Sequence, residues 1–443
     1  MKIIHAPFCF YPDPIGGTEV YVESLVRNLQ KQGTDNIVVV PGKKNEESVY
    51  NGILIRRFAV SQSINDLREI YGEGEKEGAI QFARILEEEK PDLFHLHAFT
   101  RDASLRLVQA AKQRQIPTIF TYHTPTVSCV RGTLMYLGET VCGGQLDRVQ
   151  CTRCVLHANG LSPTISKLLS TIPPSLSAQI NQRGLQGKVW TALRMSELIA
   201  LRHTATHALF AEVAHVVVVA NWIREVLLCN GVPEQKLTLC RHGLAHANRK
   251  SDINQTVQVC KQLRLVFLGR LDETKGLDIV LQAFQMLPNA SITLDIYGIQ
   301  QEKEKTPYQQ KLLKWIEKDG RVRLHPPVAS EQVISLLQNY DSLVVPSRWL
   351  ETGPLVVLEA FASGIPVIGS KLGGIAEWVE DNVNGLLVEV DSPSAWAKTL
   401  ERLIDNPKLV VQLASNITTP RTMDVVASEM LALYKTIVNA NKI

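Results

Sequence analysis

Residues 346–377, PSRWLETGPLVVLEAFASGIPVIGSKLGGIAE, continue an apolar run into the order loop, helix, strand, loop, helix. The apolar run ends at Pro346 and predicts a strand, and a polar loop then leads to a helix expected over 355–363. Thr352, Gly353 and Pro354 would lie at the start of this helix, where the backbone N–H groups have no intrahelical partner. These N–H groups and the helix dipole favour binding of an anion such as a phosphate.

Two carboxylates flank this turn. Glu351 and Glu359 have seven residues between them, so one would lie beside the anion site and the other about one helical turn further along. A carboxylate repels a phosphate unless it accepts hydrogen bonds from neutral hydroxyl groups. The pattern therefore favours a ligand that carries phosphates and hydroxyls together, such as a sugar nucleotide.

The stretch resembles the donor-site signature of retaining glycosyltransferases of family 4, of the bacterial exopolysaccharide or glycolipid type. The resemblance includes Glu351, Glu359 and Ala360, followed by GIPVI at 364–368 and GGIAE at 373–377. It implies the GT-B fold, an α/β architecture in which two Rossmann-like domains with doubly wound parallel sheets face a cleft. It also implies that Glu359 binds the ribose hydroxyls of a nucleoside diphosphate sugar. The sugar hydroxyls and phosphates would contact Glu351, Thr352, Gly353, Pro354 and Leu355.

The totals agree with a large globular protein. At 443 residues we expect two or three domains, and 45% hydrophobic with 21% charged residues is typical of soluble chains. A net charge of +3 does not indicate nucleic-acid binding. No apolar run reaches the ~20 residues of a membrane span, and residues 1–17 lack the apolar region of a signal peptide. We therefore expect a cytoplasmic protein, with the inner face of the membrane as an alternative location.

In the N-terminal half, strand-like runs at 2–6, 36–40, 53–58, 93–96 and 118–122 alternate with helical segments. This alternation predicts a parallel sheet covered on both faces, with ligands beyond the carboxyl ends of the strands. Gly16 and Gly17 follow the first strand, and the resemblance implies that they contact the donor diphosphate. His123 ends the fifth run and matches the family's active-site histidine, which hydrogen-bonds the donor sugar near its reacting carbon. His95 and His97 share one strand face, which favours a structural or acceptor-facing role over a metal pair.

Residues 126–213 interrupt the alternation and are predicted to be an insertion. Four cysteines within it, Cys129, Cys142, Cys151 and Cys154, allow either a structural zinc site or free thiols. The last two form a CTRC pair, whereas twelve residues separate the first two. Between residues 161 and 210, five basic residues accompany one acid, Glu197, which predicts either a solvated helix face or a surface for an anionic lipid or polyprenyl diphosphate; they are Lys167, Arg183, Lys188, Arg194 and Arg202.

We predict an N-terminal acceptor-side domain at 1–247, a linker at 248–262, a nucleotide-sugar domain at 263–422, and a last helix at 423–443 that crosses back. Arg270 and Lys275 follow the first strand of the second domain, and the pair resembles the family's diphosphate clamp. Val328 lies in the loop where the family holds the base. His242 stands where the family has an asparagine, so we leave it out of the site except as a hinge candidate.

The resemblance implies hexose transfer, with retention, from a UDP-sugar such as UDP-glucose to a sugar or lipid-linked sugar, in polysaccharide or glycolipid synthesis. His123, Arg270, Lys275 and Glu351 are the expected catalytic residues. No metal or other cofactor is required if Arg270, Lys275 and the helix start balance the charge of the leaving diphosphate. The alternatives are a sugar-nucleotide epimerase, a phosphorylase, or a non-catalytic scaffold of a polysaccharide assembly complex.

Overall fold

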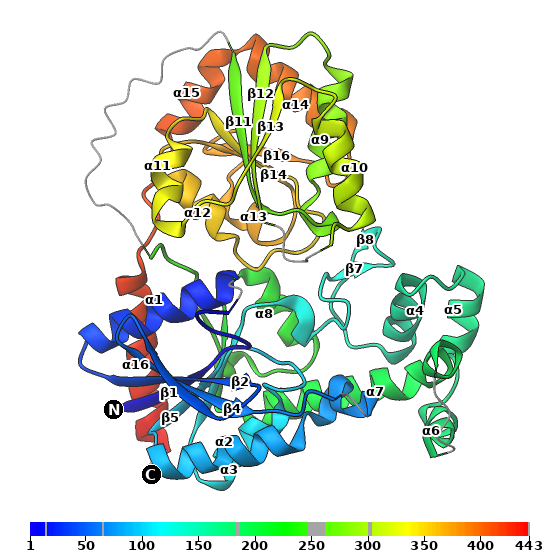
Figure 1. Ribbon diagram of the computed structural model, residues 1–443, viewed down its shortest axis with the longest axis vertical. Helices are drawn as coiled ribbons and strands as arrows, with labels where there is room; N and C mark the ends of the chain where they lie inside the picture. Colours follow the sequence, from blue (N-terminus) through cyan, green and yellow to red (C-terminus); the bar gives the residue numbers. More distant parts are fainter. Residues whose placement is uncertain (14–15, 64–65, 183–186, 246–261, 300–303, 442–443) are drawn as a thin grey trace. The chain divides into compact units, whose positions relative to one another are not determined.

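The computed structural model describes residues 1–13, 16–63, 66–182, 187–245, 262–299 and 304–441. The chain divides into unit 1, residues 1–241 with 423–443, and unit 2, residues 242–422 (Figure 1). The division falls at 241 rather than at 247 because Leu244 forms a β-bridge with Thr422 and so stays with unit 2. Most of the predicted linker, 248–262, lies outside the described residues.

The described part of unit 1 is built on an eight-stranded sheet in the order β10-β9-β6-β5-β1-β2-β4-β3. All neighbours pair in parallel except β3 and β4. Its strands are β1 (Lys2–Ala6), β2 (Asp35–Gly42), β3 (Glu46–Tyr50), β4 (Ile53–Ala59), β5 (Leu93–Leu96), β6 (Thr118–Tyr122), β9 (His215–Val218) and β10 (Leu237–Leu239).

Helices cover both faces of this sheet, so the buried strands are apolar on both sides (Figure 1). One face packs against α1 (Gly17–Lys31) and the C-terminal helix α16 (Met423–Ala440). The other face packs against α2 (Lys76–Glu89), α3 (Leu105–Gln113), the end of α7 (Lys188–Glu212) and α8 (Asn221–Cys229). A one-turn π-helix, η1 (Glu69–Glu73), and a 3-10 turn, η3 (Glu234–Lys236), lie in the connections.

The predicted insertion lies in the long connection from β6 to β9. It contains η2 (Pro125–Val127), a hairpin of β7 (Met135–Tyr136) and β8 (Thr140–Val141), and the helices α4 (Arg148–Ala158), α5 (Pro163–Ser170), α6 (Pro174–Gln182) and α7. Leu209 and Phe210 at the end of α7 pack into the sheet core, so this helix also serves as the crossover between the two parallel strands.

The predicted positive face is wrong for two of its arginines, because both are buried. Arg194 pairs with Glu197 at 3.3 Å. Arg202 donates to the Thr126 carbonyl oxygen at 2.7 Å and lies over the Phe99 ring. These guanidinium groups therefore stabilise the packing of α7, while Arg183 lies outside the described residues.

Unit 2 is a second doubly wound α/β unit. The described residues form a six-stranded parallel sheet in the order β13-β12-β11-β14-β15-β16. The strands are β11 (Leu263–Arg270), β12 (Ile292–Ile299), β13 (Val322–His325), β14 (Ser342–Val345), β15 (Val367–Ser370) and β16 (Gly385–Val388). The period of two is visible in β14, where Val344 faces one core while Leu343 and Val345 face the other.

The helices of unit 2 divide between the two sheet faces (Figure 1). One face carries α9 (Leu277–Met286), α10 (Pro307–Ile316), α14 (Pro393–Asp405) and α15 (Pro407–Ser415). The other carries α11 (Val333–Leu337), α12 (Leu355–Ala362) and α13 (Gly373–Trp378), while η4 (Glu273–Lys275) and η5 (Ser330–Gln332) are short turns. Among the described residues of both units, no helix combines the length and hydrophobicity that crossing a bilayer requires.

Candidate functional site

The loop between β14 and α12 carries Glu351, and the fold surrounds this carboxylate with donors. Its Oε1 accepts from the Lys275 ammonium at 2.6 Å, the Ser347 hydroxyl at 2.8 Å and the Trp349 indole N–H at 2.9 Å. The Glu351 residue is only 5% exposed. A buried carboxylate with three donors on one oxygen is fixed in position, and it fixes the Lys275 side chain beside the start of α12.

Helix α12 begins at Leu355, as the sequence predicts. Pro354 is the N-cap residue and has no side-chain group that could satisfy the first-turn N–H groups. Thr352, two residues before it, is buried, and the intervening Gly353 is partly exposed. The structure thus brings Lys275, Glu351 and the helix start together within unit 2.

Backbone packing holds this loop against the next helix. The Gly374 N–H donates to the Glu351 carbonyl oxygen at 2.7 Å, and Gly373 has φ of +50°. A Cβ on Gly374 would lie 2.7 Å from that oxygen and 3.0 Å from the Gly353 nitrogen. The glycine pair is therefore needed for close approach of two backbones, as well as for the turn itself.

Arg348 ties the same loop to α9, and sequence reasoning missed it. Its guanidinium donates to both carboxylate oxygens of Asp278, at 2.6 and 2.9 Å, and also to Asp391. Its backbone N–H donates to the Thr274 carbonyl oxygen at 2.8 Å, next to Lys275. Arg348 thereby positions the segment that carries Lys275, although no spacing rule connects residues seventy positions apart.

His242, which the sequence analysis retains only as a hinge candidate, contacts the same loop. Its Nδ1 lies 3.1 Å from the Gly353 carbonyl oxygen, so Nδ1 carries the proton and donates. Burial lowers the pKa of His242 to about 4, so the ring is neutral near pH 7. A neutral histidine here fixes the Gly353 peptide without adding charge.

The remaining donor-site candidates of unit 2 lie at separate positions on its strands and helices. Arg270 ends β11 and forms an ion pair with Asp272 at 3.2 Å, with its side chain 40% exposed. Val328 is partly exposed in the loop that follows β13. Glu359 lies on α12, and burial raises the pKa of its carboxyl to about 7.

In unit 1, His123 is the end of a chain of buried histidines that reaches from strand to strand. His123 Nε2 lies 3.1 Å from His97 Nδ1, His97 Nε2 lies 3.2 Å from His5 Nδ1, and His5 Nε2 lies 3.0 Å from Asn36 Oδ1. The Asn36 amide nitrogen donates to Thr34, which directs the Asn36 oxygen toward His5.

The hydrogen bonds along this chain of histidines determine which ring nitrogen of each residue carries the proton. Burial lowers the pKa values of His5 and His97, so both rings are neutral and each carries one N–H. Because Asn36 Oδ1 can only accept, His5 is protonated at Nε2, and each following ring must donate through Nε2 in turn. His123 therefore carries a proton on Nε2, which it donates to His97 Nδ1.

Other polar groups of unit 1 have structural partners. One ring nitrogen from each of His5, His95 and His97 lies within 4.8 Å of the corresponding nitrogens of the other two. Each of the six nitrogens has a protein partner, and those of His95 bond to Tyr434 and Thr121. The expected structural role of His95 therefore agrees with its contacts. Gly16 is the N-cap of α1, and its N–H donates to Glu19 at 2.8 Å.

Two family models match the chain. Glycosyltransferase Family 4 matches residues 15–148, and Glycosyl transferases group 1 matches residues 248–419. D-inositol 3-phosphate glycosyltransferase of Streptomyces griseus is 32% identical over 158 residues, 34% of this chain and 33% of that protein. The chain thus matches about a third of the length of these curated relatives.

Solved structures resemble the chain over nearly its whole length. Anabaena Alr3699/HepE, solved in complex with UDP and glucose, has a TM-score of 0.64 and 15% identity, with 98% of this chain and 100% of that chain covered. Sucrose-phosphate synthase from Thermosynechococcus elongatus has a TM-score of 0.67 and 17% identity, with 99% of each chain covered. These similarities establish a shared fold.

Proposed function

The chain belongs to glycosyltransferase family 4 and has the GT-B fold, and from this we propose that it is a retaining, metal-independent hexosyltransferase. The donor is a nucleoside diphosphate sugar, UDP-glucose or a similar UDP-sugar, and the acceptor is a hydroxyl of a sugar or lipid-linked sugar. The observation that carries the proposal is the Lys275 ammonium, held 2.6 Å from Glu351 beside the start of α12. The HepE structure with UDP and glucose supports the choice of donor.

In the proposed reaction, the main barrier is departure of an anionic diphosphate from an oxocarbenium-like sugar. Fixed positive charge at the diphosphate lowers that barrier. Lys275, Arg270 and the first-turn N–H groups of α12 supply this charge, while Thr352, Pro354 and Leu355 shape the turn. A divalent metal is then unnecessary, and phosphate-assisted deprotonation activates the acceptor hydroxyl.

The carboxylates have different roles. Glu359 accepts hydrogen bonds from the ribose hydroxyls, and Val328 lies in the loop assigned to the base. Glu351 is held by three donors, so its first role is to position Lys275, and its other oxygen is the one assigned to a sugar hydroxyl. In unit 1, Gly16 and Gly17 are assigned to the diphosphate. His123 is assigned a hydrogen bond to the donor sugar near its reacting carbon.

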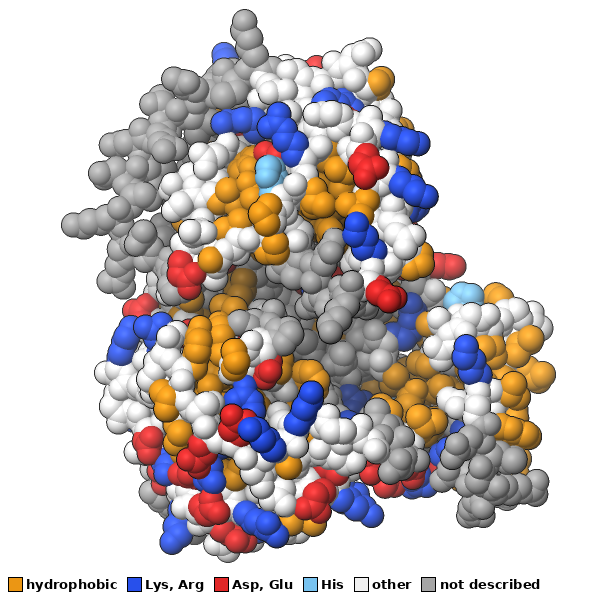
Figure 2. Space-filling view, viewed as in Figure 1, with side chains coloured by type: hydrophobic (Ala, Val, Ile, Leu, Met, Phe, Trp, Pro, Cys, Tyr) orange, Lys and Arg blue, Asp and Glu red, His pale blue; other side chains and the backbone are white. Residues whose placement is uncertain are grey.

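A lipid-linked acceptor has support from the surface of the insertion. Ile165 and Leu168 on α5, and Leu176 on α6, are 50%, 70% and 54% exposed, and Figure 2 shows apolar side chains gathered over this region. Apolar patches of this kind bind lipid or other apolar partners. We therefore place the enzyme in the cytoplasm at the inner face of the membrane, acting in polysaccharide or glycolipid synthesis.

A panel of sugar nucleotides in a thermal-shift assay identifies the donor. UDP release is then measured with free and lipid-linked sugars, and the anomeric configuration of the product is read by NMR. We expect acceptor-dependent UDP release, retention, and unchanged turnover in EDTA. An inverted product contradicts the retaining mechanism, and turnover that EDTA abolishes and added Mg²⁺ restores contradicts metal independence.

The alternatives give different results in the same assays. An epimerase interconverts donors without an acceptor, and a phosphorylase requires inorganic phosphate. A non-catalytic scaffold releases no UDP with any donor and acceptor. The Lys275–Glu351 contact argues against lost catalysis, because it keeps a cation at the expected anion site.

A further inference from the structure

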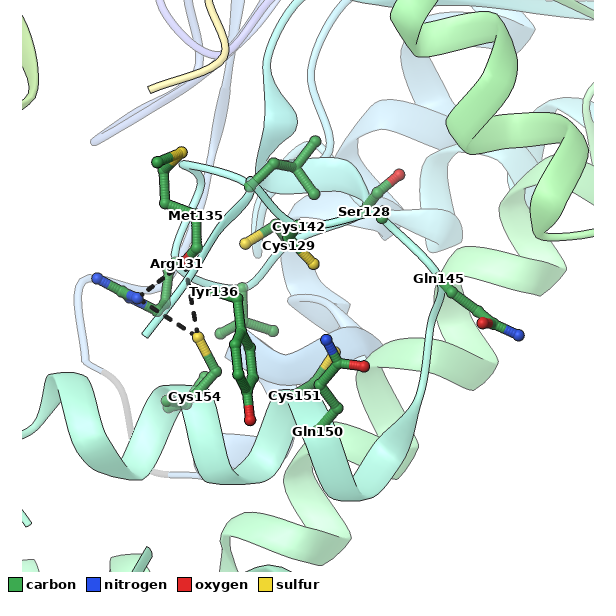
Figure 3. Close-up of a pocket in the computed structure, with 14 residues that line it drawn as sticks. Ser128, Cys129, Arg131, Met135, Tyr136, Cys142, Gln145, Gln150, Cys151 and Cys154 are labelled. Carbon is green, nitrogen blue, oxygen red and sulfur yellow. Dashed lines mark hydrogen bonds between the residues drawn. The ribbon is translucent and has the colours of Figure 1, made fainter. Parts of the chain in front are cut away.

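Four cysteines of the insertion line one small cavity in unit 1. Cys129 lies after η2, Cys142 follows the β7–β8 hairpin, and Cys151 and Cys154 lie on α4. The cavity encloses about 30 Å³ (Figure 3). In Figure 3 the sulfurs of Cys129 and Cys142 lie on the hairpin side, and the Cys154 sulfur points up from α4 toward them. The fold thus brings together thiols that are up to twenty-five residues apart in sequence.

Burial raises the pKa of the Cys142 and Cys151 thiols, whereas two backbone N–H groups at the cavity are directed at sulfur and act in the opposite direction. The Leu137 N–H donates to the Cys154 sulfur at 3.3 Å, and the Gly144 N–H hydrogen-bonds to the Cys142 sulfur. Gly144 has φ of +76°, and a Cβ there would lie 2.6 Å from Val226. N–H groups directed at sulfur favour its anionic form, which is the form that binds a metal.

Leu137 requires an unusual backbone to make this contact. It has φ of +54°, and Leu134 at the other end of β7 has φ of +52°, a left-handed conformation that a branched apolar residue seldom adopts. Cys151 and Cys154 need no such strain, because a separation of three residues places them on one face of α4. The segment after η2 and the segment after the hairpin therefore present one sulfur each, and α4 presents two.

The charge of the side chains around the cavity and the volume of the cavity both indicate which metal it can hold. Four thiolates around a divalent cation leave two net negative charges, and the Arg131 guanidinium lies 3.4 Å from the Cys154 sulfur, where it offsets part of that charge. The cavity holds about one ion or water molecule, which is too little for an iron–sulfur cluster of several atoms. Apart from the cysteines and Arg131, apolar residues such as Leu134, Met135 and Val155 form much of the lining.

We propose that Cys129, Cys142, Cys151 and Cys154 bind one Zn²⁺ as four thiolates and thereby fasten the hairpin to α4. Zinc–sulfur bonds of about 2.3 Å in a tetrahedron place neighbouring sulfurs about 3.8 Å apart. In the described residues no three of these sulfurs all lie within 4.8 Å of one another, so binding draws them inward. Each thiol that is protonated beforehand releases its proton to solvent when the metal binds.

The metal content of the intact protein is the first test. Full-length protein is produced with zinc in the medium and analysed by native and elemental mass spectrometry. We expect about one zinc per chain, and cobalt exchange should give the visible absorption of a tetrahedral thiolate site. Chain without zinc, a disulfide among the four cysteines, or iron with sulfide each overturns the proposal.

Variants identify the ligands. Cys154→Ser and Cys142→Ser should lose most of the zinc, whereas Cys240→Ser, a buried cysteine that does not line the cavity, should keep it. If the ligand variants are insoluble, the wild-type protein is titrated instead with a thiol-specific mercurial. A colorimetric chelator then measures the zinc that is released. Zinc that survives Cys154→Ser, or release without loss of the four thiols, refutes the assignment. Glycosyl transfer is not needed for these readouts.

Discussion

Glu359 gives a sharp test of the donor site, because its pKa lies in the range where assays are run. Burial raises the pKa of this carboxyl to about 7, so it is mostly protonated at pH 6 and mostly ionised at pH 8. A carboxylate accepts hydrogen bonds from both ribose hydroxyls, whereas a protonated carboxyl also places a donor there. With a pKa of about 7, the ionised fraction rises from ~0.09 to ~0.91 between these pH values. Donor affinity should therefore rise about tenfold.

Calorimetric titration with UDP-glucose measures this change, because its diphosphate diester does not titrate between pH 6 and 8. Glu359→Gln is the matched control, with similar volume and no titration, and it should bind UDP-glucose equally at both pH values. His242 cannot cause the step, since burial lowers its pKa to about 4. Equal wild-type affinity at both pH values, or a tenfold step that persists in Glu359→Gln, refutes the role of this carboxylate.

Three further substitutions separate chemistry from packing. Lys275→Met should lower turnover by ~10²-fold or more, with Lys275→Arg partly restoring it, and near-normal turnover in the methionine variant contradicts the charge argument. His97→Phe removes the acceptor that orients His123, so kcat should fall about tenfold with little change in KM. A change in thermal stability alone would show that the chain of buried histidines has only a structural role. Arg348→Met leaves two aspartates without their partner and should lower the free energy of unfolding by roughly 2 kcal/mol in urea titrations, because the pair is partly exposed. A loss below about 0.5 kcal/mol would show that solvent already screens this pair.

The sequence predicts the parallel strands well, because burial on both faces makes them continuous apolar runs. The expected strands 93–96 and 118–122 agree with β5 and β6 at both ends. The same reasoning missed β3, which reads Glu-Glu-Ser-Val-Tyr and is mostly exposed. This edge strand exists through its antiparallel pairing with β4, including an ion pair between Glu47 and Arg56 at 3.0 Å. Such pairing is tertiary and leaves no local pattern.

The candidate site likewise combines features that a local sequence pattern predicts with contacts that only the tertiary structure shows. The anion-binding turn and Glu351 can be read locally, because the strand, loop and helix are contiguous. The contact between Lys275 and Glu351 joins residues 76 positions apart, and the His242 contact with Gly353 joins residues 111 apart. The resemblance assigns Lys275 and Glu351 to the donor site but does not predict their contact, and His242 was left out because it departs from the family's usual residue. A residue that departs from the family motif can therefore still make a contact of its own, as His242 does with Gly353.

A signature motif also combines residues that act for different physical reasons. Gly374 is required because two backbones meet, and Gly276, with φ of +66°, is required because a Cβ would overlap the Pro346 carbonyl oxygen. Neither glycine has chemistry to offer a substrate, yet both fix where Lys275 and Glu351 lie. The presence of such residues indicates that the scaffold of the site is intact, whereas the charge contact between Lys275 and Glu351 is a feature that the proposed reaction requires. Lys275 and Glu351 therefore support an inference of activity better than the two glycines do, because a non-catalytic scaffold protein would also keep glycines that are needed for packing.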